Sequence, residues 1–483
     1  LPFILLAISL PLLLGGCGGE KKEPVSEVKA VEEKQQAVKT EEPVAETKPT
    51  EEVPVNPNLK YEIKDGMVTI TGCDRKASGT ITIPATIDGN PVSSIGNEAF
   101  YQCSSLTSIV ISDSVTSIGS SAFVSCESLT SITIPDSVTS IGGGAFYGCA
   151  SLTSITIPDS VTSIGEGSFF FCDSLTNIEV GAGNGHYASI NGVLFNAEKT
   201  MLLTYPEGKT DANYTIPNSV TSIEDRAFSS ITYPTFLTTI TIGNGVTSIG
   251  ERAFMNCSSL TNIEVGTGNV NYASVNGVLF NAEKTVLLAY PARKTGANYT
   301  IPDSVTLIEA DAFDGCRSLT NIKIPDGVTS IGEGAFARCN SLTNIKIPDG
   351  VTSIGDSTFA SCNSLTSITI PDRVTSIGDS AFFFCDSLTS ITIPDGVTSI
   401  GNSAFMGCKS LTSITIPDSV TSIGDHVFRK CESLTPVTFL GDAPKATENM
   451  FFATSVTIYR KPEAKGWSDT YGGRPVKLIS EKP

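Results

Sequence analysis

The chain has 483 residues, of which 17% are charged, and its formal net charge is −18. The excess of carboxylates argues against a nucleic-acid-binding protein, which needs clustered lysines and arginines to neutralise phosphates, and against unaided adsorption to an anionic membrane. A globular chain of this length would form about three domains, but internal repetition of the sequence predicts one elongated structure instead.

The chain begins with an apolar run from Leu1 to Leu14. A membrane-spanning helix needs ~20 apolar residues, so we interpret residues 1–16 as a signal peptide. No basic segment precedes the run, and we therefore expect the natural chain to begin before Leu1.

Leu14-Gly15-Gly16 stands directly before Cys17. This short motif resembles the lipobox of bacterial lipoproteins. The resemblance implies that Cys17 is acylated, becomes the mature N-terminus and anchors an exported chain to the bacterial cell envelope. The alternative is an ordinary signal peptide followed by an incidental cysteine.

Residues 17–58 differ in composition from the rest of the chain. They are rich in Glu, Lys, Pro, Val and Thr and contain no aromatic side chain. Such a segment cannot bury enough apolar surface to order itself, so we predict a lipid anchor followed by a disordered tether. About forty flexible residues have an end-to-end distance of ~35 Å, which would hold a folded part away from the membrane.

One phrase recurs every 23 residues over most of residues 99–436. A repeat of about 20 to 30 residues is typical of a solenoid, in which each unit buries its apolar face against the next. Residues 59–98 are predicted to form an N-terminal cap and the first coil. Residues 437–483, which contain the single tryptophan Trp467, are predicted to form a C-terminal cap. The copies are marked by Phe100, Phe123, Phe146, Phe169, Phe228, Phe254, Phe313, Phe336, Phe359, Phe382, Phe405 and Phe428.

The copy from Leu129 to Cys149 serves as an example. The alternation in Ile132-Thr133-Ile134 predicts a strand with one buried face. Pro135-Asp136-Ser137 predicts a turn, after which a Val-Thr-Ser-Ile segment points inward again. The Ala-Phe-x-x-Cys segment has the spacing of a tight turn, as in one turn of helix or 3₁₀-helix. Each coil therefore presents apolar side chains that only a neighbouring coil can cover.

The L-x-x-L-x-L opening of each copy resembles the leucine-rich repeat. Its particular form, with Ile-Pro-Asp, Val-Thr-Ser-Ile-Gly and Ala-Phe-x-x-Cys, resembles the BspA-like subfamily of bacterial surface proteins over residues 60–480. The resemblance implies a mainly β, right-handed solenoid with a parallel sheet on its concave face and short, 3₁₀ or helical turns opposite. It also implies a role in adhesion to matrix proteins or in cell–cell contact.

Two longer units duplicate each other at an offset of 85 residues, and they contain inserts at residues 181–212 and 266–297. Two apolar runs around an Asn-Ala-Glu-Lys-Thr turn predict a β-hairpin in each insert. We consider the tyrosines of these inserts as candidates for stacking on sugars. They are Tyr187, Tyr205, Tyr272 and Tyr290.

Eleven cysteines lie three residues after the marker phenylalanines. An exported protein invites disulfides or metal binding, but stacked thiols lie about a strand spacing apart, wider than the ~3.8 Å between Cβ atoms of a disulfide. Ile231 also replaces one of them. We therefore predict buried free thiols, and no evident partner for Cys73. The eleven are Cys103, Cys126, Cys149, Cys172, Cys257, Cys316, Cys339, Cys362, Cys385, Cys408 and Cys431.

No constellation of catalytic residues is evident. The two histidines, His186 and His426, have no visible helper, and Asn271 replaces His186 in the duplicated unit. The glycine-rich stretch 181–185 loses its third glycine in the duplicate and precedes no helix, so a turn is favoured over a phosphate-binding loop. We predict no enzyme, no cofactor and no metal centre.

A row of aspartates follows Ile-Pro in eight copies. A divalent cation could bridge such a row, but Ca²⁺ prefers six or more oxygen ligands, so turn capping is the favoured interpretation. The row comprises Asp136, Asp159, Asp303, Asp326, Asp349, Asp372, Asp395 and Asp418.

The outward positions of the strands are mostly Ser and Thr, which suit an exposed sheet without any ligand. Four copies deviate from this pattern and provide the candidate ligand-binding residues of the concave face. These are Glu179, Glu264, Asn321, Lys323, Asn344 and Lys346.

These features predict a non-enzymatic, lipid-anchored surface protein, a monomer that binds a protein ligand through its solenoid. The alternatives are a glycan-binding envelope protein and a structural spacer. We expect contact with the membrane only through the lipid anchor and no contact with nucleic acid.

Overall fold

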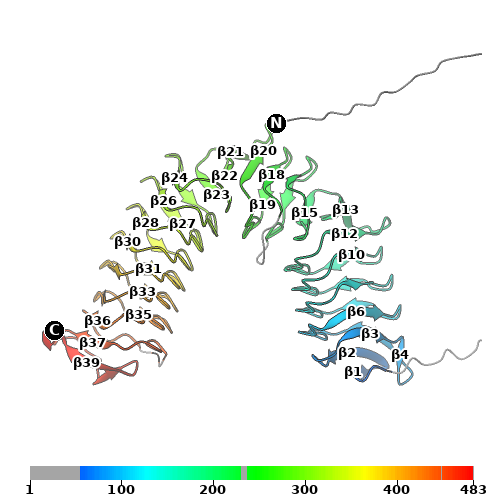
Figure 1. Ribbon diagram of the computed structural model, residues 1–483, viewed down its shortest axis with the longest axis horizontal. Helices are drawn as coiled ribbons and strands as arrows, with labels where there is room; N and C mark the ends of the chain where they lie inside the picture. The colour runs from blue at the N-terminus through cyan, green and yellow to red at the C-terminus, as the bar shows by residue number, and fades with distance from the viewer. Residues whose placement is uncertain (1–54, 230–235, 446, 448, 482–483) are drawn as a thin grey trace, which may run out of the picture. The chain divides into compact units, whose positions relative to one another are not determined.

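The computed structural model describes residues 55–229, 236–445, 447 and 449–481. The predicted signal peptide, Cys17 and most of the predicted tether lie outside these residues. From residue 59 onward the chain winds into stacked coils that follow one another in sequence order, from blue to red in Figure 1. The predicted parallel β-solenoid is confirmed.

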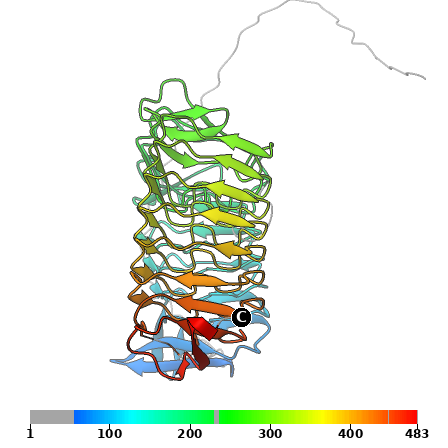
Figure 2. The same cartoon turned by 90° about the vertical axis from the view of Figure 1, so that its left-hand side faces the viewer.

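The first side of each coil carries the strand that the Ile-Thr-Ile alternation predicts. In these strands Ile side chains are buried and the intervening Ser, Thr, Asn, Glu or Lys is mostly exposed. This side consists of several hydrogen-bonded segments, and within each segment successive strands pair in parallel and mostly in register. Figure 2 shows the strands crossing the stack one above another. The strands of this first sheet are β3 (Gly79–Ile83), β6 (Leu106–Ile111), β8 (Ser131–Ile132), β10 (Ser154–Ile157), β12 (Asn177–Val180), β16 (Asn213–Thr215), β18 (Thr239–Ile242), β20 (Asn262–Val265), β24 (Asn298–Thr300), β26 (Asn321–Lys323), β28 (Asn344–Lys346), β30 (Ser367–Thr369), β32 (Ser390–Ile391), β34 (Ile414–Ile416), β36 (Pro436–Phe439) and β37 (Thr457–Arg460).

The second side is a further parallel sheet, which the sequence did not reveal because most of its strands are only a Ser-Ile pair. The Ile points into the core and the backbone bonds to the neighbouring coils. Its strands are β5 (Asn90–Ile95), β7 (Ser117–Ile118), β9 (Ser140–Ile141), β11 (Ser163–Ile164), β15 (Met201–Thr204), β17 (Ser222–Ile223), β19 (Ser248–Ile249), β23 (Val286–Ala289), β25 (Leu307–Ile308), β27 (Ser330–Ile331), β29 (Ser353–Ile354), β31 (Ser376–Ile377), β33 (Ser399–Ile400) and β35 (Ser422–Ile423).

The third side is the Ala-Phe-x-x-Cys segment, and it is a chain of turns rather than a helix. Cys149 N donates to Phe146 O, three residues earlier, at 3.1 Å, while Phe123 N donates to Ala145 O of the next coil at 2.8 Å. Two residues of each such segment have positive φ, for example Ser121 and Ser125, both at 57°. Residues in the left-handed backbone conformation cannot continue a right-handed helix. The chain therefore changes direction here and enters the next side of the coil.

The phenylalanines of the third side stack on one another inside the core. Ring centroids of successive coils lie 5.1 to 5.9 Å apart with small interplanar angles. This ring ladder continues past the predicted end of the repeat, because Phe451 stacks on Phe428 at 5.6 Å.

The ends of the stack are closed by antiparallel strands, which leave fewer unpaired edges. At the start, β1 (Leu59–Lys64) pairs with β2 (Met67–Cys73), and β4 (Thr86–Ile87) pairs with β5. At the other end, β38 (Thr470–Tyr471) pairs with β39 (Arg474–Leu478), followed by a 3₁₀ turn, η1 (Ile479–Glu481).

Each insert forms an antiparallel meander that starts a new segment of the second sheet. In the first insert, β13 (Tyr187–Ile190) pairs with β14 (Val193–Asn196), and β14 pairs with β15. The second insert repeats this with β21 (Tyr272–Val275), β22 (Val278–Asn281) and β23. The predicted hairpin around Asn-Ala-Glu-Lys-Thr is therefore present, and a second hairpin precedes it.

The inserts divide the apolar core into three clusters. The first extends from Leu59 to Leu194, the second from Val193 to Leu279, and the third from Val278 to Tyr471. The ring ladder has the same three segments. We call the passage from Phe169 to Tyr205 the first junction and the passage from Phe254 to Tyr290 the second junction.

Candidate functional site

The structure gathers four of the predicted ligand-binding residues, with one more, on three adjacent strands. Asn321 of β26 is paired in register with Asn298 of β24 on one side and with Asn344 of β28 on the other. All three asparagines are exposed. On β26 and β28 the lysine two positions further along is also exposed, while the Ile between is buried. We call Asn298, Asn321, Lys323, Asn344 and Lys346 the Asn–Lys patch.

The electrostatics of the Asn–Lys patch differ from those of the rest of the first sheet. Lys323 and Lys346 hold equivalent positions on neighbouring strands, which are ~4.8 Å apart, so their charges repel each other. Lys346 Nζ lies 3.9 Å from Asp326 Oδ1, but both side chains are mostly exposed, and such an ion pair contributes little. The patch can therefore accept hydrogen bonds and carboxylates from a partner.

Asn298 escaped sequence reasoning, although its signal was present. It precedes Tyr-Thr-Ile at the point where the regular strand resumes after the second insert. Aligning that strand with Asn321-Ile-Lys would have shown three asparagines in one row.

Glu179 and Glu264 do not join the Asn–Lys patch. They occupy equivalent places on β12 and β20, opposite Thr156 and Thr241 of the preceding strands. Each carboxylate accepts a 2.9 Å hydrogen bond from an asparagine two residues earlier. Glu179 and Glu264 therefore lie on other segments of the sheet, and each is hydrogen-bonded within its own strand.

Two of the candidate sugar-stacking tyrosines are core residues, which corrects the prediction for them. Tyr205 and Tyr290 are each only 6% exposed and begin new segments of the ring ladder, stacking on Phe228 at 5.2 Å and on Phe313 at 5.1 Å. They are buried because their apolar runs continue the core instead of projecting from it. A sugar cannot reach these rings.

The other two tyrosines are half-buried and tied to the preceding coil. Tyr187 Oη accepts a 2.8 Å hydrogen bond from Ile164 N. Tyr272 Oη donates to Thr247 O at 3.4 Å. Part of each ring remains accessible, so only these two insert aromatics keep the proposed role open.

The eleven cysteines of the repeat are buried free thiols with a structural task. In most coils the thiol donates to the carbonyl of the phenylalanine in the preceding coil, for example Cys385 Sγ to Phe359 O at 3.2 Å. Burial raises the pKa of Cys126 and of Cys431 to about 12. A protonated, buried thiol is a poor nucleophile and metal ligand.

The polar residues considered for chemistry lie apart from one another. In the row of aspartates, the carboxylate of Asp159 accepts a 3.0 Å hydrogen bond from Gly183 N of the next coil. Throughout the described ranges, no group of three or more His, Cys, Asp or Glu side chains is arranged to hold a metal ion. The structure shows a partner for His426 that the sequence analysis did not recognise. His426 Nδ1 lies 3.2 Å from Asp425 Oδ2. Thr447 donates to this carboxylate and not to the imidazole, which is not the geometry of a catalytic triad.

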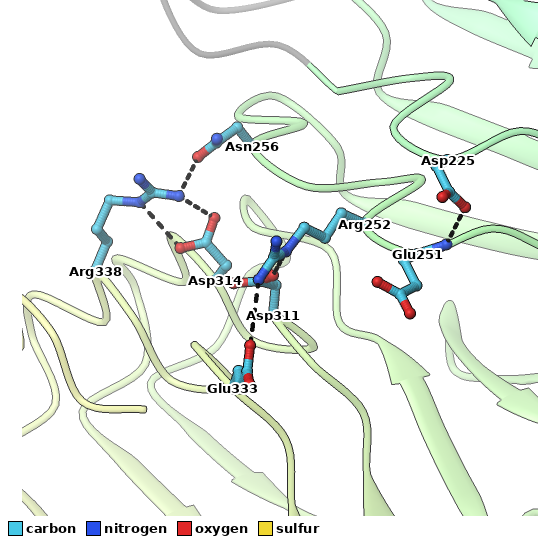
Figure 3. Close-up of polar contacts among 8 residues, drawn as sticks. All are labelled: Asp225, Glu251, Arg252, Asn256, Asp311, Asp314, Glu333 and Arg338. Carbon is cyan, nitrogen blue, oxygen red and sulfur yellow. Dashed lines mark hydrogen bonds and ion pairs between the residues drawn. The ribbon is translucent and has the colours of Figure 1, made fainter. Parts of the chain in front are cut away.

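A charged cluster at the second junction was also missed, because its members are far apart in sequence. Figure 3 shows Arg338 facing Asp314 and Asn256, and Arg252 facing Asp311 and Glu333. Arg338 makes a two-pronged contact with Asp314, at 2.9 Å from Nε to Oδ1 and 2.5 Å from Nη2 to Oδ2.

A cavity lies between this charged cluster and the apolar core. It measures about 580 Å³ and is lined by apolar side chains such as Phe254 and Leu279 and by carboxylates of the charged cluster. The equivalent cavity at the first junction measures about 230 Å³. There, Phe171 N donates to Glu207 Oε1 at 2.9 Å, a bond that the second junction cannot make because Ala292 replaces Glu207. The two copies of the duplicated unit therefore differ at their junctions.

Coils with a Leu-x-x-Ile-x-Ile strand, three hydrogen-bonded sides and an apolar interior define a leucine-rich-repeat solenoid. Residues 93–211, 209–282, 293–412 and 352–464 match a family profile described as "BspA type Leucine rich repeat region (6 copies)". The chain therefore belongs to the BspA-type leucine-rich repeat family, as its repeat motifs implied.

Several solved structures are similar to this chain. A leucine-rich cell surface protein of Faecalibacterium prausnitzii A2-165 is 34% identical over 75% of this chain and 93% of its own, with a TM-score of 0.48. A leucine-rich repeat protein of Eubacterium ventriosum is 23% identical over 87% and 98%, with a TM-score of 0.38. The pneumococcal vaccine antigen PcpA is 21% identical over 85% and 93%, with a TM-score of 0.40.

No curated protein matches the chain. Within the part of the chain that the structure describes, no helix has the length and apolar composition needed to cross a membrane.

Proposed function

We propose that the chain is a non-enzymatic, lipid-anchored protein of the bacterial cell envelope whose solenoid binds another macromolecule. Family membership supports the scaffold role, because repeat solenoids present extended surfaces built from many equivalent positions. The lipobox-like Leu14-Gly-Gly-Cys17 supports the anchor. The tether would then hold the solenoid outward.

The observation that carries the binding proposal is the Asn–Lys patch. In a chain of net charge −18, two exposed ammonium groups stand side by side, and the flanking strands present Thr300 and Thr369 at the equivalent positions. A protein partner with surface carboxylates would relieve the repulsion between Lys323 and Lys346 and take hydrogen bonds from the asparagine row. Complementary charge of this kind sets specificity and association rate.

The test begins with capture of envelope or matrix proteins by the purified chain, followed by affinity measurement for each retained protein. Lys323→Glu combined with Lys346→Glu should weaken binding about 10- to 100-fold, because carboxylates would then face carboxylates. Rising salt should weaken the wild-type complex, since screening acts on exposed charges. Lys60→Glu with Lys64→Glu, on the exposed face of β1, changes the net charge equally and should leave affinity unchanged.

Equal affinities for the patch variant and the β1 variant would refute the patch as the binding site. If the purified chain retains no protein, that result would favour a role as a structural spacer. The glycan alternative now rests on Tyr187 and Tyr272 alone. Retention of a glycan that Tyr187→Ala with Tyr272→Ala abolishes would favour that alternative.

A further inference from the structure

The first thiol of the cysteine ladder has a neighbour that the other ladder thiols lack. Cys73 ends β2, and its Sγ donates to Asp74 O at 3.6 Å. Cys103 Sγ donates to the same carbonyl oxygen at 3.8 Å. The two thiols therefore converge on one carbonyl oxygen. Cys73 therefore has a partner after all.

This arrangement arises because the ladder begins here. Elsewhere a thiol bonds to a phenylalanine carbonyl one coil back, as Cys126 does with Phe100 O at 3.2 Å. No such phenylalanine precedes Cys103, and the turn after β2 fills its place with Cys73 and Asp74. Cys73 thus approaches from the end of a cap strand instead of from the Ala-Phe-x-x-Cys turn of a stacked coil. The strand-spacing argument against disulfides between ladder neighbours does not apply to this pair.

The two thiols also differ in accessibility. Cys103 is fully buried, whereas Cys73 is half-exposed at the edge of the cap. An oxidant in solution can therefore reach Cys73 first, with Cys103 poised behind it as the second thiol. The remaining ladder cysteines are all buried.

We propose that Cys73 and Cys103, which are free thiols in this structure, are joined on oxidation as a disulfide that fastens the N-terminal cap to the first coil. Cys73 attacks a disulfide-bearing oxidant, such as oxidised glutathione or a dithiol oxidase, to give a mixed disulfide and release one thiol. Cys103 then attacks the Cys73 sulfur and releases the second thiol. The protein loses two protons and two electrons, and the oxidant disulfide is reduced to two thiols.

The bond would protect the end of the solenoid where fraying begins. A terminal coil has a neighbour on one side only, so it opens more easily than an internal coil. The cross-link closes the loop from residue 73 to residue 103, which spans β3, β4 and β5. It restricts the opened state of this cap without altering the ladder behind it.

The experiment treats the folded full chain with oxidised glutathione, blocks remaining thiols and maps peptides by mass spectrometry without reduction. The expected result is one cross-linked peptide pair, Cys73–Cys103, lacking two hydrogen atoms, with the other ladder cysteines blocked only after denaturation. Limited proteolysis within residues 59–103 should slow several-fold on oxidation. Reductant should reverse both effects.

Cys73→Ser provides the key variant because its side chain is half-exposed and its loss should not impair folding. In this variant proteolysis should no longer respond to oxidation, whereas the matched ladder variant Cys149→Ser should respond as wild type. Two unmodified thiols at positions 73 and 103 after oxidation would overturn the proposal, as would a cross-link between Cys73 and Cys17. The outcome is independent of the identity of any ligand.

Discussion

At the scale of single residues, the ladder cysteines act as small apolar side chains that also donate a hydrogen bond. In this slot of the coil the thiol adds a second hydrogen bond to a phenylalanine carbonyl of the preceding coil, which also accepts from the backbone N–H three residues later, as Phe359 O does from Cys362 N. In the last coil Thr454 takes the slot and its hydroxyl donates to Phe428 O at 2.7 Å. The slot therefore selects a small donor rather than thiol chemistry, which explains why so many cysteines remain unpaired.

This selection predicts different costs for two substitutions at one position. Cys385→Ala removes the thiol's hydrogen bond to Phe359 O, which still accepts from Cys362 N, and should lower the free energy of unfolding by about 0.5–1.5 kcal/mol. Cys385→Thr keeps a donor of the kind found at Thr454 and should cost clearly less. Urea unfolding followed by circular dichroism compares the two. Equal losses would show that packing alone, and not the hydrogen bond, determines the residue at this position.

At the scale of elements, the third side of each coil depends on left-handed residues in fixed places. Gly148 and Gly407 occupy the same position of the turn in different coils, with φ of 73° and 77°. Their surroundings differ. A Cβ on Gly407 would lie 2.3 Å from Phe384 Cδ1, while one on Gly148 would meet nothing closer than 3.5 Å.

The two glycines form a matched pair for an alanine substitution. Gly148→Ala should cost about 1–2 kcal/mol, the strain of a left-handed alanine. Gly407→Ala carries the same strain and must also displace the Phe384 ring, which adds about 1–3 kcal/mol for overpacking. The measurement is urea unfolding of both variants. Equal destabilisation would mean that the turn shifts freely to admit the methyl group.

Each insert contains two hairpins, of which the sequence analysis predicted only the second. The hairpin around Asn-Ala-Glu-Lys-Thr followed from two apolar runs. The hairpin before it has Asn191-Gly192 at its tip, with φ of 51° and 79°, as in a type I′ turn. Asn-Gly between alternating apolar residues is a strong hairpin signal, so β13 and β14 were predictable from the sequence.

At the scale of the whole molecule, the solenoid is three stacks of coils joined at two junctions. At each junction the ring ladder is interrupted and charged residues span the gap. Arg226 Nη1 lies 4.0 Å from Glu166 Oε1 at the first junction, and Arg252 Nε lies 2.6 Å from Asp311 Oδ2 at the second. Arg226 and Asp311 occupy corresponding positions of the duplicated unit with opposite charges, whereas Arg252 corresponds to Gly167.

The second junction should be sensitive to loss of Arg338. The Asp314 side chain is only 1% exposed, and without the guanidinium it would be a buried, uncompensated carboxylate. Arg338→Ala should therefore destabilise by about 3 kcal/mol, the low end for a buried pair because Arg338 itself is partly exposed. Hydrogen exchange should rise on both sides of the junction, including the turn at Asn256.

The double variant Arg338→Ala with Asp314→Ala provides the control. It removes the carboxylate as well and should recover part of the lost stability, so the two single effects should not add. Strict additivity would mean that Arg338 stabilises the junction through packing alone. Arg429→Ala, on another coil, should leave exchange at the second junction unchanged.

The sequence by itself determined the solenoid, the buried face of each strand and the buried position of the repeated thiols. Periodicity and alternation specify which side chains point inward, and they are local properties. Only the tertiary structure decided the second sheet, the bond partners of Cys73 and Arg338, and the burial of Tyr205 and Tyr290. Those contacts depend on the register between coils and on how the three core segments meet, so residues as far apart as Asn256 and Arg338 become neighbours.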